Sequence, residues 1–171
     1  MQPHRLRLLF SKDQIEAAVG MLADQLNQRF AEKDPLFLVV MNGAYMFATD
    51  LLKQFIHPCT LAFIDVKSYS GTTRFVLDAD SSRIPDLTNR HVVILEDIVD
   101  SGTTMAWLKK ETAGCGAASV TSAALLNKLV PHEADADLYG LDVEDLFVVG
   151  YGLDLDGRYR NLPQIFELLQ D

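Results

Sequence analysis

The residues best suited to chemistry lie in one short run that follows an apolar, strand-like segment at residues 92–95. Two adjacent carboxylates, Glu96 and Asp97, come directly after that segment, and a third, Asp100, follows. Small and hydroxyl-bearing residues complete the run: Ser101, Gly102, Thr103 and Thr104. Free N–H groups at a helix start bind anions, and hydroxyl groups add donors. Carboxylates beside a phosphate would repel it unless they hold a divalent cation or accept hydrogen bonds from sugar hydroxyls. The run therefore predicts a sugar-phosphate site with Mg²⁺.

A simpler interpretation is that the same run is an acidic loop that caps the helix after it. Asp100 or Ser101 would then be the N-cap residue. Capping needs one such side chain, whereas these nine positions hold three carboxylates and three hydroxyl groups. We therefore favour ligand binding.

The elements that must position this run alternate between strands and helices. The Ser11–Gln14 pair is a capping box that opens a helix. Helical periodicity predicts helices over residues 12–33, 44–55 and 103–113. Apolar runs predict strands over residues 36–41, 60–66, 91–95, 119–126 and 146–149. Within the long polar stretch 68–90 we expect a short strand at 75–77, and we expect a loop over 96–102 and an amphipathic tail over 163–169. This order predicts an α/β fold with a mainly parallel central sheet flanked by helices, with ligands beyond the carboxyl ends of the strands.

The composition limits the class of protein. A chain of 171 residues is expected to form one domain. Its 15 basic and 24 acidic residues give a formal net charge of −9, which disfavours binding to nucleic acid or anionic membranes. No apolar stretch approaches the roughly 18 residues of a membrane span, and the first residues do not resemble a signal peptide. The two cysteines fit neither a disulfide framework nor a zinc site. We expect a cytoplasmic protein.

The run from Glu96 to Thr104 closely resembles the phosphoribosyl-pyrophosphate motif of type I phosphoribosyltransferases. Other segments narrow the resemblance to the 6-oxopurine branch, the hypoxanthine-guanine phosphoribosyltransferases. These segments are residues 41–43, 67–69, 125–128, 147–154 and 158–163, in the family's order and spacing. The resemblance implies the type I fold in a single domain over residues 1–171. It also implies a small purine-binding hood formed from about residues 128–171 and possibly the N-terminal segment.

The resemblance implies a purine-salvage enzyme. Such an enzyme transfers 5-phosphoribosyl from phosphoribosyl pyrophosphate to N9 of hypoxanthine or guanine with Mg²⁺, giving IMP or GMP and pyrophosphate. The turn made by Asp100, Ser101, Gly102, Thr103 and Thr104 would hold the 5′-phosphate. Glu96 and Asp97 would face the ribose hydroxyls and their Mg²⁺, and Asp100 would act as general acid or base near N7 of the purine.

The resemblance also assigns the residues around the base and the pyrophosphate. Lys128 would donate to O6, Phe147 would stack on the ring, and the Val148 carbonyl would accept from the base edge. Asp154 would hold a second Mg²⁺ near the pyrophosphate, and Arg160 would contact the pyrophosphate itself. Without the motifs, Lys128 and Arg160 are ordinary surface residues and Phe147 an ordinary core residue.

Two further segments complete the implied site. Asn42 and Gly43 would contact the pyrophosphate, with a cis peptide bond between Met41 and Asn42. Many members have Lys or Arg where this chain has Asn42, so backbone N–H groups and Arg160 would make that contact here. Ser68 and Tyr69, which begin the polar stretch, would close over the transition state and exclude water.

Two other functions compete with this one. Asp154-Leu155-Asp156-Gly157 after an apolar strand looks like the nucleophile motif of haloacid-dehalogenase-type phosphohydrolases, but only 14 residues follow it. A regulatory protein that binds phosphoribosyl pyrophosphate and RNA without turnover would need a basic face, and the basic residues form no dense cluster. We expect a homo-oligomer, a dimer or a tetramer, with the apolar faces around residues 44–55 as a possible interface.

Overall fold

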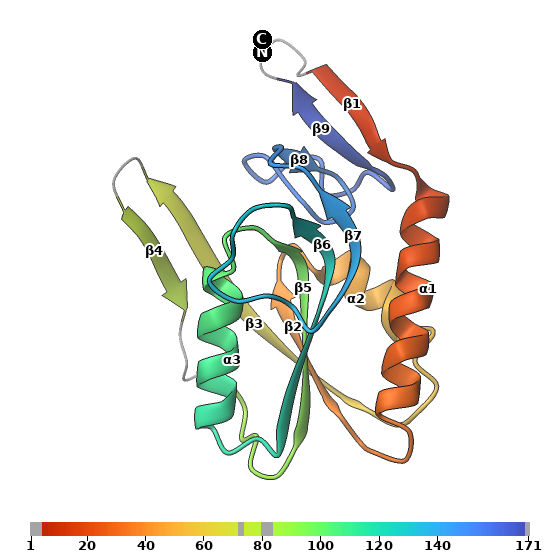
Figure 1. Cartoon of the computed structure of the whole chain (residues 1–171), viewed down its shortest axis with the longest axis vertical. Helices are drawn as coiled ribbons and strands as arrows, with labels where there is room; N and C mark the ends of the chain where they lie inside the picture. Colours follow the sequence, from red (N-terminus) through yellow and green to blue (C-terminus); the bar gives the residue numbers. More distant parts are fainter. Residues whose placement is uncertain (1–4, 72–73, 80–83, 170–171) are drawn as a thin grey trace.

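The computed structural model describes residues 5–71, 74–79 and 84–169, with side chains described over 5–66 and 84–169 (Figure 1). Its centre is a six-stranded sheet in the order β4-β3-β2-β5-β6-β7. The strands are β2 (Leu36–Met41), β3 (Thr60–Gly71), β4 (Arg74–Ala79), β5 (His91–Val99), β6 (Ser119–Lys128) and β7 (Leu138–Val143). All pairings are parallel except that of the edge strand β4 with β3. The predicted fold class is confirmed.

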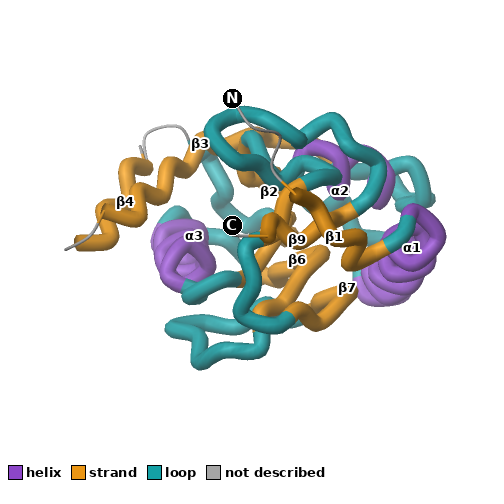
Figure 2. Tube along the Cα trace, turned by 90° about the horizontal axis from the view of Figure 1, so that it is seen from above, coloured by secondary structure: helices purple, strands orange, loops and turns teal. Residues whose placement is uncertain are grey.

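Helices cover both faces of this sheet because its central strands carry apolar residues on both sides, as β2 does at every position. On β2, Phe37 and Val39 pack on the side of α1 (Lys12–Arg29) and α2 (Tyr45–Leu52). Leu38 and Val40 pack with residues of α3 (Thr103–Gly114) on the other side. Figure 2, seen from above, shows α3 apart from α1 and α2 with strands between them.

The predicted helices are present with some shorter ends. Ser11 forms the expected capping box, since its hydroxyl accepts from the Gln14 N–H at 3.3 Å and Gln14 Oε1 accepts from the Ser11 N–H at 3.0 Å. α1 ends at Arg29 rather than at 33, and α2 covers Tyr45–Leu52 rather than 44–55. The capping residues thus located the helix start better than the apolar spacing located the ends.

A second, three-stranded antiparallel sheet lies at the end of the molecule that also holds the ends of the described chain (Figure 1). Its order is β1-β9-β8, from Arg5–Phe10, Ile165–Leu169 and Val148–Val149. The sequence did not predict β1, and it assigned a strand at 146–149 to the central sheet and a tail to 163–169. In the structure, β7 rather than residues 146–149 is the last strand of the central sheet, beside β6, and Val148–Val149 pair with β9.

Two predicted loops are partly strands. β5 runs on through Val99, where a loop over 96–102 was predicted, because Glu96 and Ile98 continue the pairing with Ala124 and Leu126 of β6. The predicted polar stretch 68–90 begins as a hairpin, with Tyr69 of β3 paired to Val76 of β4. In Figure 2 this hairpin projects from the body beside α3.

Across the described part of the chain, none of the helices combines the length and the apolar character that a membrane crossing requires.

Candidate active site

A cleft of about 430 Å³ opens where β2 and β5 end, as expected for a parallel sheet. Most of the residues predicted from the sequence line it together. They are Asn42, Gly43, Glu96, Asp97, Asp100, Ser101, Gly102, Thr103, Thr104, Asp154 and Arg160. Residues from three distant parts of the chain therefore meet in one cleft.

The turn between β5 and α3 supplies the hydroxyl groups of this cleft. The N-cap residue of α3 is Gly102, with φ of 75°, so neither Asp100 nor Ser101 takes the N-cap position. The Ser101 hydroxyl accepts one long hydrogen bond, of 3.5 Å, from the Thr103 N–H. The hydroxyls of Ser101 and Thr103 lie 3.1 Å apart. A Cβ at Gly102 would lie 2.5 Å from the carbonyl oxygen of Ala134, so this position needs glycine for both conformation and space. The simple capping interpretation is wrong.

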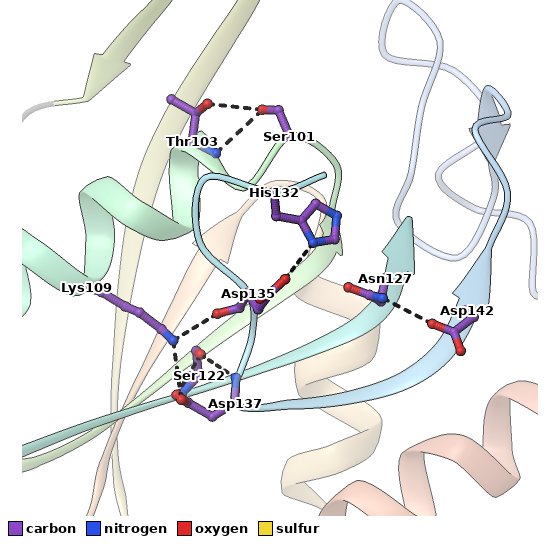
Figure 3. Close-up of polar contacts among 9 residues, drawn as sticks. All are labelled: Ser101, Thr103, Lys109, Ser122, Asn127, His132, Asp135, Asp137 and Asp142. Atoms are coloured by element: carbon purple, nitrogen blue, oxygen red, sulfur yellow. Dashed lines mark hydrogen bonds and ion pairs between the residues drawn. The ribbon is translucent and has the colours of Figure 1, made fainter. Parts of the chain in front are cut away.

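The loop between β6 and β7 supports this turn from outside the cleft. The Glu133 N–H donates to the carbonyl oxygen of Ser101 at 2.9 Å. Lys109 of α3 donates to the carbonyl oxygen of Asp135 at 2.9 Å and pairs with Asp137 at 3.3 Å (Figure 3). The same loop therefore holds both the turn and the helix that follows it.

Glu96, which is buried, and Asp97, which is half-buried, are carboxylates on the floor of the cleft. Glu96 is 8% exposed, and its Oε2 has no hydrogen-bond partner among the described residues. Burial, and next the charge of Asp97, raise the pKa of Glu96 well above its usual value. Burial also raises the pKa of Asp97 to about 6, although the Ile98 N–H and the charge of Arg160 act in the opposite direction. This weakly compensated pair fits a cation, because a cation would stabilise both charged forms.

Two glycines allow the segments around the cleft to touch. A Cβ on Gly43 would lie 1.7 Å from Oδ2 of Asp97, and a Cβ on Gly152 would lie 2.0 Å from the carbonyl oxygen of Gly43. The Met41–Asn42 peptide bond, just before Gly43, is cis, as the resemblance implied. Gly152 was not predicted as a site residue, although its place in Gly150-Tyr151-Gly152 was a visible signal.

Asp154 and Arg160 form one side of the cleft as a pair. Arg160 Nη2 lies 2.6 Å from Asp154 Oδ1, and Nη1 donates to the carbonyl oxygen of Gly152 at 2.5 Å. The Gly157 N–H donates to the second Asp154 oxygen at 2.6 Å. Because its side chain is 28% exposed and held at two points, Arg160 is not the free surface residue that it would be without the motif.

Lys128 ends β6 beside the cleft and is 9% exposed. Its Nζ lies 3.0 Å from Asp100 and 3.2 Å from Asp145. Burial acts to lower the pKa of Lys128, but hydrogen bonds and charge from the two carboxylates outweigh it and raise that pKa. Asp145 was missed by sequence reasoning because nothing in its local pattern points to Lys128.

The predicted purine-binding residues Lys128, Phe147 and Val148 are not among the described residues that line the cleft. Phe147 is 48% exposed, so it is not a core residue, and Val148 is buried in β8. Ser68 and Tyr69 belong to β3, and their side chains lie outside the described residues.

Comparison with known proteins identifies the family. The model of the phosphoribosyl transferase domain matches residues 9–156. The hypoxanthine-guanine phosphoribosyltransferase of Bacillus subtilis is 37% identical over 167 residues, covering 93% of this chain and 91% of that protein. This chain belongs to the hypoxanthine-guanine phosphoribosyltransferase family. A member from Mycobacterium tuberculosis is 35% identical over 172 residues, covering 92% of this chain and 83% of that protein.

Solved structures of this phosphoribosyltransferase family have the same fold. A hypoxanthine phosphoribosyltransferase from Staphylococcus aureus has a TM-score of 0.88 at 31% identity, covering 95% of this chain and 91% of that one. A hypoxanthine-guanine phosphoribosyltransferase from Bacillus anthracis has a TM-score of 0.85 at 30% identity, covering 98% of this chain and 100% of that one. The family model ends at residue 156, so it includes Asp154 but not Arg160.

Proposed function

We propose that this protein is an enzyme of purine salvage. It transfers the 5-phosphoribosyl group from phosphoribosyl pyrophosphate to N9 of hypoxanthine or guanine, which gives IMP or GMP and pyrophosphate. The observation that carries the proposal is the contact of Asp100, the first residue of the phosphate turn, with Lys128 at 3.0 Å. A donor suited to a purine oxygen thus adjoins a turn suited to a phosphate.

The phosphate end of the substrate would bind at the turn before α3. The first residues of α3 line the cleft, and the free N–H groups of a helix N-terminus attract anions. Ser101 and Thr104 would add hydroxyl donors, Thr103 lies between them, and Gly102 allows the close approach of a phosphate.

The base would bind between Lys128 and Phe147. Lys128 would donate to O6, which hypoxanthine and guanine have and adenine lacks, so adenine would offer no acceptor to this lysine. The half-exposed ring of Phe147 is available for stacking, and the Val148 carbonyl would accept from the base edge. The small sheet β1-β9-β8, which carries Val148, would form the hood over the base.

Asp100 would act as the general acid or base at N7. Its side chain is 63% exposed at the cleft, so a ligand can reach it. A carboxylate there favours the positive charge that develops as the bond to C1′ of the donor loosens. As the bond from C1′ to pyrophosphate breaks and the bond to N9 forms, the base loses one proton, which Asp100 would receive.

Glu96 and Asp97 would hold one Mg²⁺ at the ribose hydroxyls, and Asp154 would hold a second near the pyrophosphate. Among the described residues no three carboxylate, imidazole or thiol side chains form a metal site by themselves, so substrate oxygens and water would complete each ligand set. Mg²⁺ is usually held by one or two carboxylates together with substrate oxygens and water, and the unpartnered Oε2 of Glu96 fits such a ligand set. When bound, Mg²⁺ supplies positive charge to the ribose and pyrophosphate oxygens. Asn42, Gly43 and Arg160 would contact the pyrophosphate, and Ser68 and Tyr69 would close over the reacting atoms.

We also propose a homo-oligomer, a dimer or a tetramer, formed through the apolar surface beside α2. Tyr45, Leu61 and Phe63 are 37%, 49% and 58% exposed there, which is unusual for large apolar side chains that lie close together. Light scattering at several concentrations tests this proposal, and a stable monomer would contradict it. The cytoplasmic location stays a prediction.

A spectrophotometric assay with phosphoribosyl pyrophosphate and Mg²⁺ tests the function directly. Adenine, hypoxanthine, guanine and xanthine are supplied separately, each with a chelator control. We expect Mg²⁺-dependent nucleotide formation from hypoxanthine or guanine and none from adenine. Binding of phosphoribosyl pyrophosphate without turnover of any base would instead favour the regulatory alternative. Phosphate release without phosphoribosyl pyrophosphate would favour the phosphohydrolase alternative.

A further inference from the structure

Tyr151 connects the segment that carries Asp154 and Arg160 to helix α2. Its hydroxyl group donates to Oδ2 of Asp50, on α2, at 2.8 Å. Tyr151 is 5% exposed, and Asp50 lies 101 positions away in the sequence. A partly buried hydrogen bond between such distant segments fixes their relative position more firmly than apolar contact alone, because it is directional.

The backbone around Tyr151 is held in an unusual shape that directs this side chain toward α2. Tyr151 has φ of 51° and lies between Gly150 and Gly152, whose φ values are 101° and 102°. A positive φ is uncommon for a large residue and persists only where the surroundings impose it. Here the Tyr151 N–H donates to the carbonyl oxygen of Leu162 at 2.8 Å, which fixes the peptide group.

The residue after Tyr151 touches two groups of the cleft. The closely packed backbone of Gly152 has no room for a Cβ because of the Gly43 carbonyl oxygen. The carbonyl oxygen of Gly152 accepts from the Arg160 guanidinium. The Gly152 N–H donates to the Arg160 carbonyl oxygen at 3.0 Å. Since α2 begins at Tyr45, two residues after Gly43, any shift of α2 against Tyr151 would change the contact between Gly43 and Gly152.

We infer that Tyr151 and Asp50 are positioning residues for the pyrophosphate side of the cleft. Their hydrogen bond holds the turn with Gly43 and the segment with Arg160 in the register that binds the pyrophosphate group of the donor substrate. The purine side, at Lys128, belongs to other strands and does not depend on this bond. The inference rests on the proposed transferase function, and it adds residues that contact no substrate.

We expect removal of the Tyr151 hydroxyl group alone to leave the fold intact, because Asp50 keeps other partners. The pair lines a cavity of about 510 Å³ between α1 and α2, so water can reach Asp50. Asp50 also keeps its contact with Lys53 at 3.1 Å. Burial, followed by the hydrogen bond to Asp50, raises the pKa of Tyr151, so the hydroxyl stays a neutral donor at ordinary pH.

The experiment compares steady-state constants for Tyr151→Phe, Asp50→Ala and the double variant. For each single variant we expect KM for phosphoribosyl pyrophosphate to rise about 3–10-fold, the range expected from one lost hydrogen bond, with KM for hypoxanthine unchanged. The double variant should resemble either single variant, because both remove the same bond. Asp50→Asn, unlike Asp50→Ala, should keep the wild-type KM for phosphoribosyl pyrophosphate, since its amide oxygen can accept from Tyr151.

Tyr139→Phe is the matched control, because Tyr139 is 45% exposed on β7 and is not among the described residues that line the cleft. Equal rises in both KM values, or additive effects in the double variant, would overturn the inference. If the wild-type protein has no transferase activity, the proposed function is wrong, but the inference about Tyr151 and Asp50 is not yet contradicted. Calorimetric binding of phosphoribosyl pyrophosphate then decides the inference: weaker binding by Tyr151→Phe supports it, and equal binding overturns it.

Discussion

Nζ of Lys128 lies 3.0 Å from a carboxylate oxygen of Asp100, and this contact joins the ends of the neighbouring strands β6 and β5. The two groups match two adjacent atoms of a 6-oxopurine, because O6 and N7 lie on the same edge of the ring. A donor and a carboxylate at this separation can meet that edge together. Asp145, at 3.2 Å, would remain a partner of Lys128 if Asp100 turned toward N7 of the base, as the proposed mechanism requires.

Asp100→Asn should lower kcat by roughly 10²–10⁴-fold, because an amide cannot receive the proton from the base. Binding of phosphoribosyl pyrophosphate should change little, since the amide keeps the size of the side chain. Rapid-quench turnover and calorimetric binding measure the two effects separately. Asp145→Asn is the matched control, as it also removes a carboxylate partner of Lys128 but one that lies outside the residues lining the cleft. Near-normal turnover by Asp100→Asn would show that Asp100 is not the general acid or base of the reaction.

Lys128→Ala should weaken recognition of 6-oxopurines and leave the donor substrate unaffected. The loss of a charged hydrogen bond to O6 predicts a rise of about 10–100-fold in KM for hypoxanthine and guanine. Stability should fall little, because both carboxylate partners, at 63% and 74% exposure, can be hydrated. Lys110→Ala, at an exposed position of α3, is the control. An unchanged preference for hypoxanthine over adenine would show that Lys128 does not select the base.

The central sheet was predictable because its strands are buried on both faces and read as apolar runs, as in residues 36–41. The strand ends were not, because polar site residues interrupt the pattern: β5 continues through Glu96 and Asp97, which were assigned to a loop. β1 was missed because its Arg-Leu-Arg-Leu alternation is short and exposed. Its stability comes from pairing with β9, a distant strand, as in the pair Arg5 and Leu169.

The candidate site was predictable where the sequence holds its residues together, as in the run Glu96–Thr104. Contacts between distant segments were not, because no local pattern records them. Asp145 beside Lys128, and the touching backbones of Gly43 and Gly152, depend on how the sheet brings the segments together. The motifs therefore indicated which residues form the cleft, and the fold showed what holds them there.

The stability of the protein should depend on pH through Asp137, in the loop that supports the phosphate turn (Figure 3). Burial acts to raise the pKa of Asp137, but hydrogen bonds from Ser122, at 2.7 and 2.8 Å, and the charge of Lys109 outweigh it and lower that pKa. A carboxylate with a lowered pKa stabilises the fold above its unfolded value of about 3.9, and this stabilisation is lost as the pH falls through the folded value.

Asp137→Asn should therefore lower the free energy of unfolding at pH 7, and its difference from the wild type should shrink as the pH falls below about 4. Urea unfolding followed by circular dichroism at a series of pH values measures this difference. Asp142→Asn is the control, because Asp142 is exposed and accepts one hydrogen bond, from Asn127 at 3.1 Å. A difference that is constant with pH would show that the charge of Asp137 does not stabilise the loop.

Gly43→Ala should disturb the carboxylate floor of the cleft more than the fold. The added Cβ would lie 1.7 Å from Oδ2 of Asp97, so this side chain must move. Overpacking of this kind costs roughly 1–3 kcal/mol of stability. Because Asp97 is a proposed Mg²⁺ ligand, we expect kcat/KM for phosphoribosyl pyrophosphate to fall at least about 100-fold, in line with small displacements at catalytic sites. Gly114→Ala is the control, since it ends α3 with nothing within 4 Å of the added Cβ. If Gly43→Ala lost stability but kept full activity, the close contact between Gly43 and Asp97 would serve folding rather than the arrangement of the site.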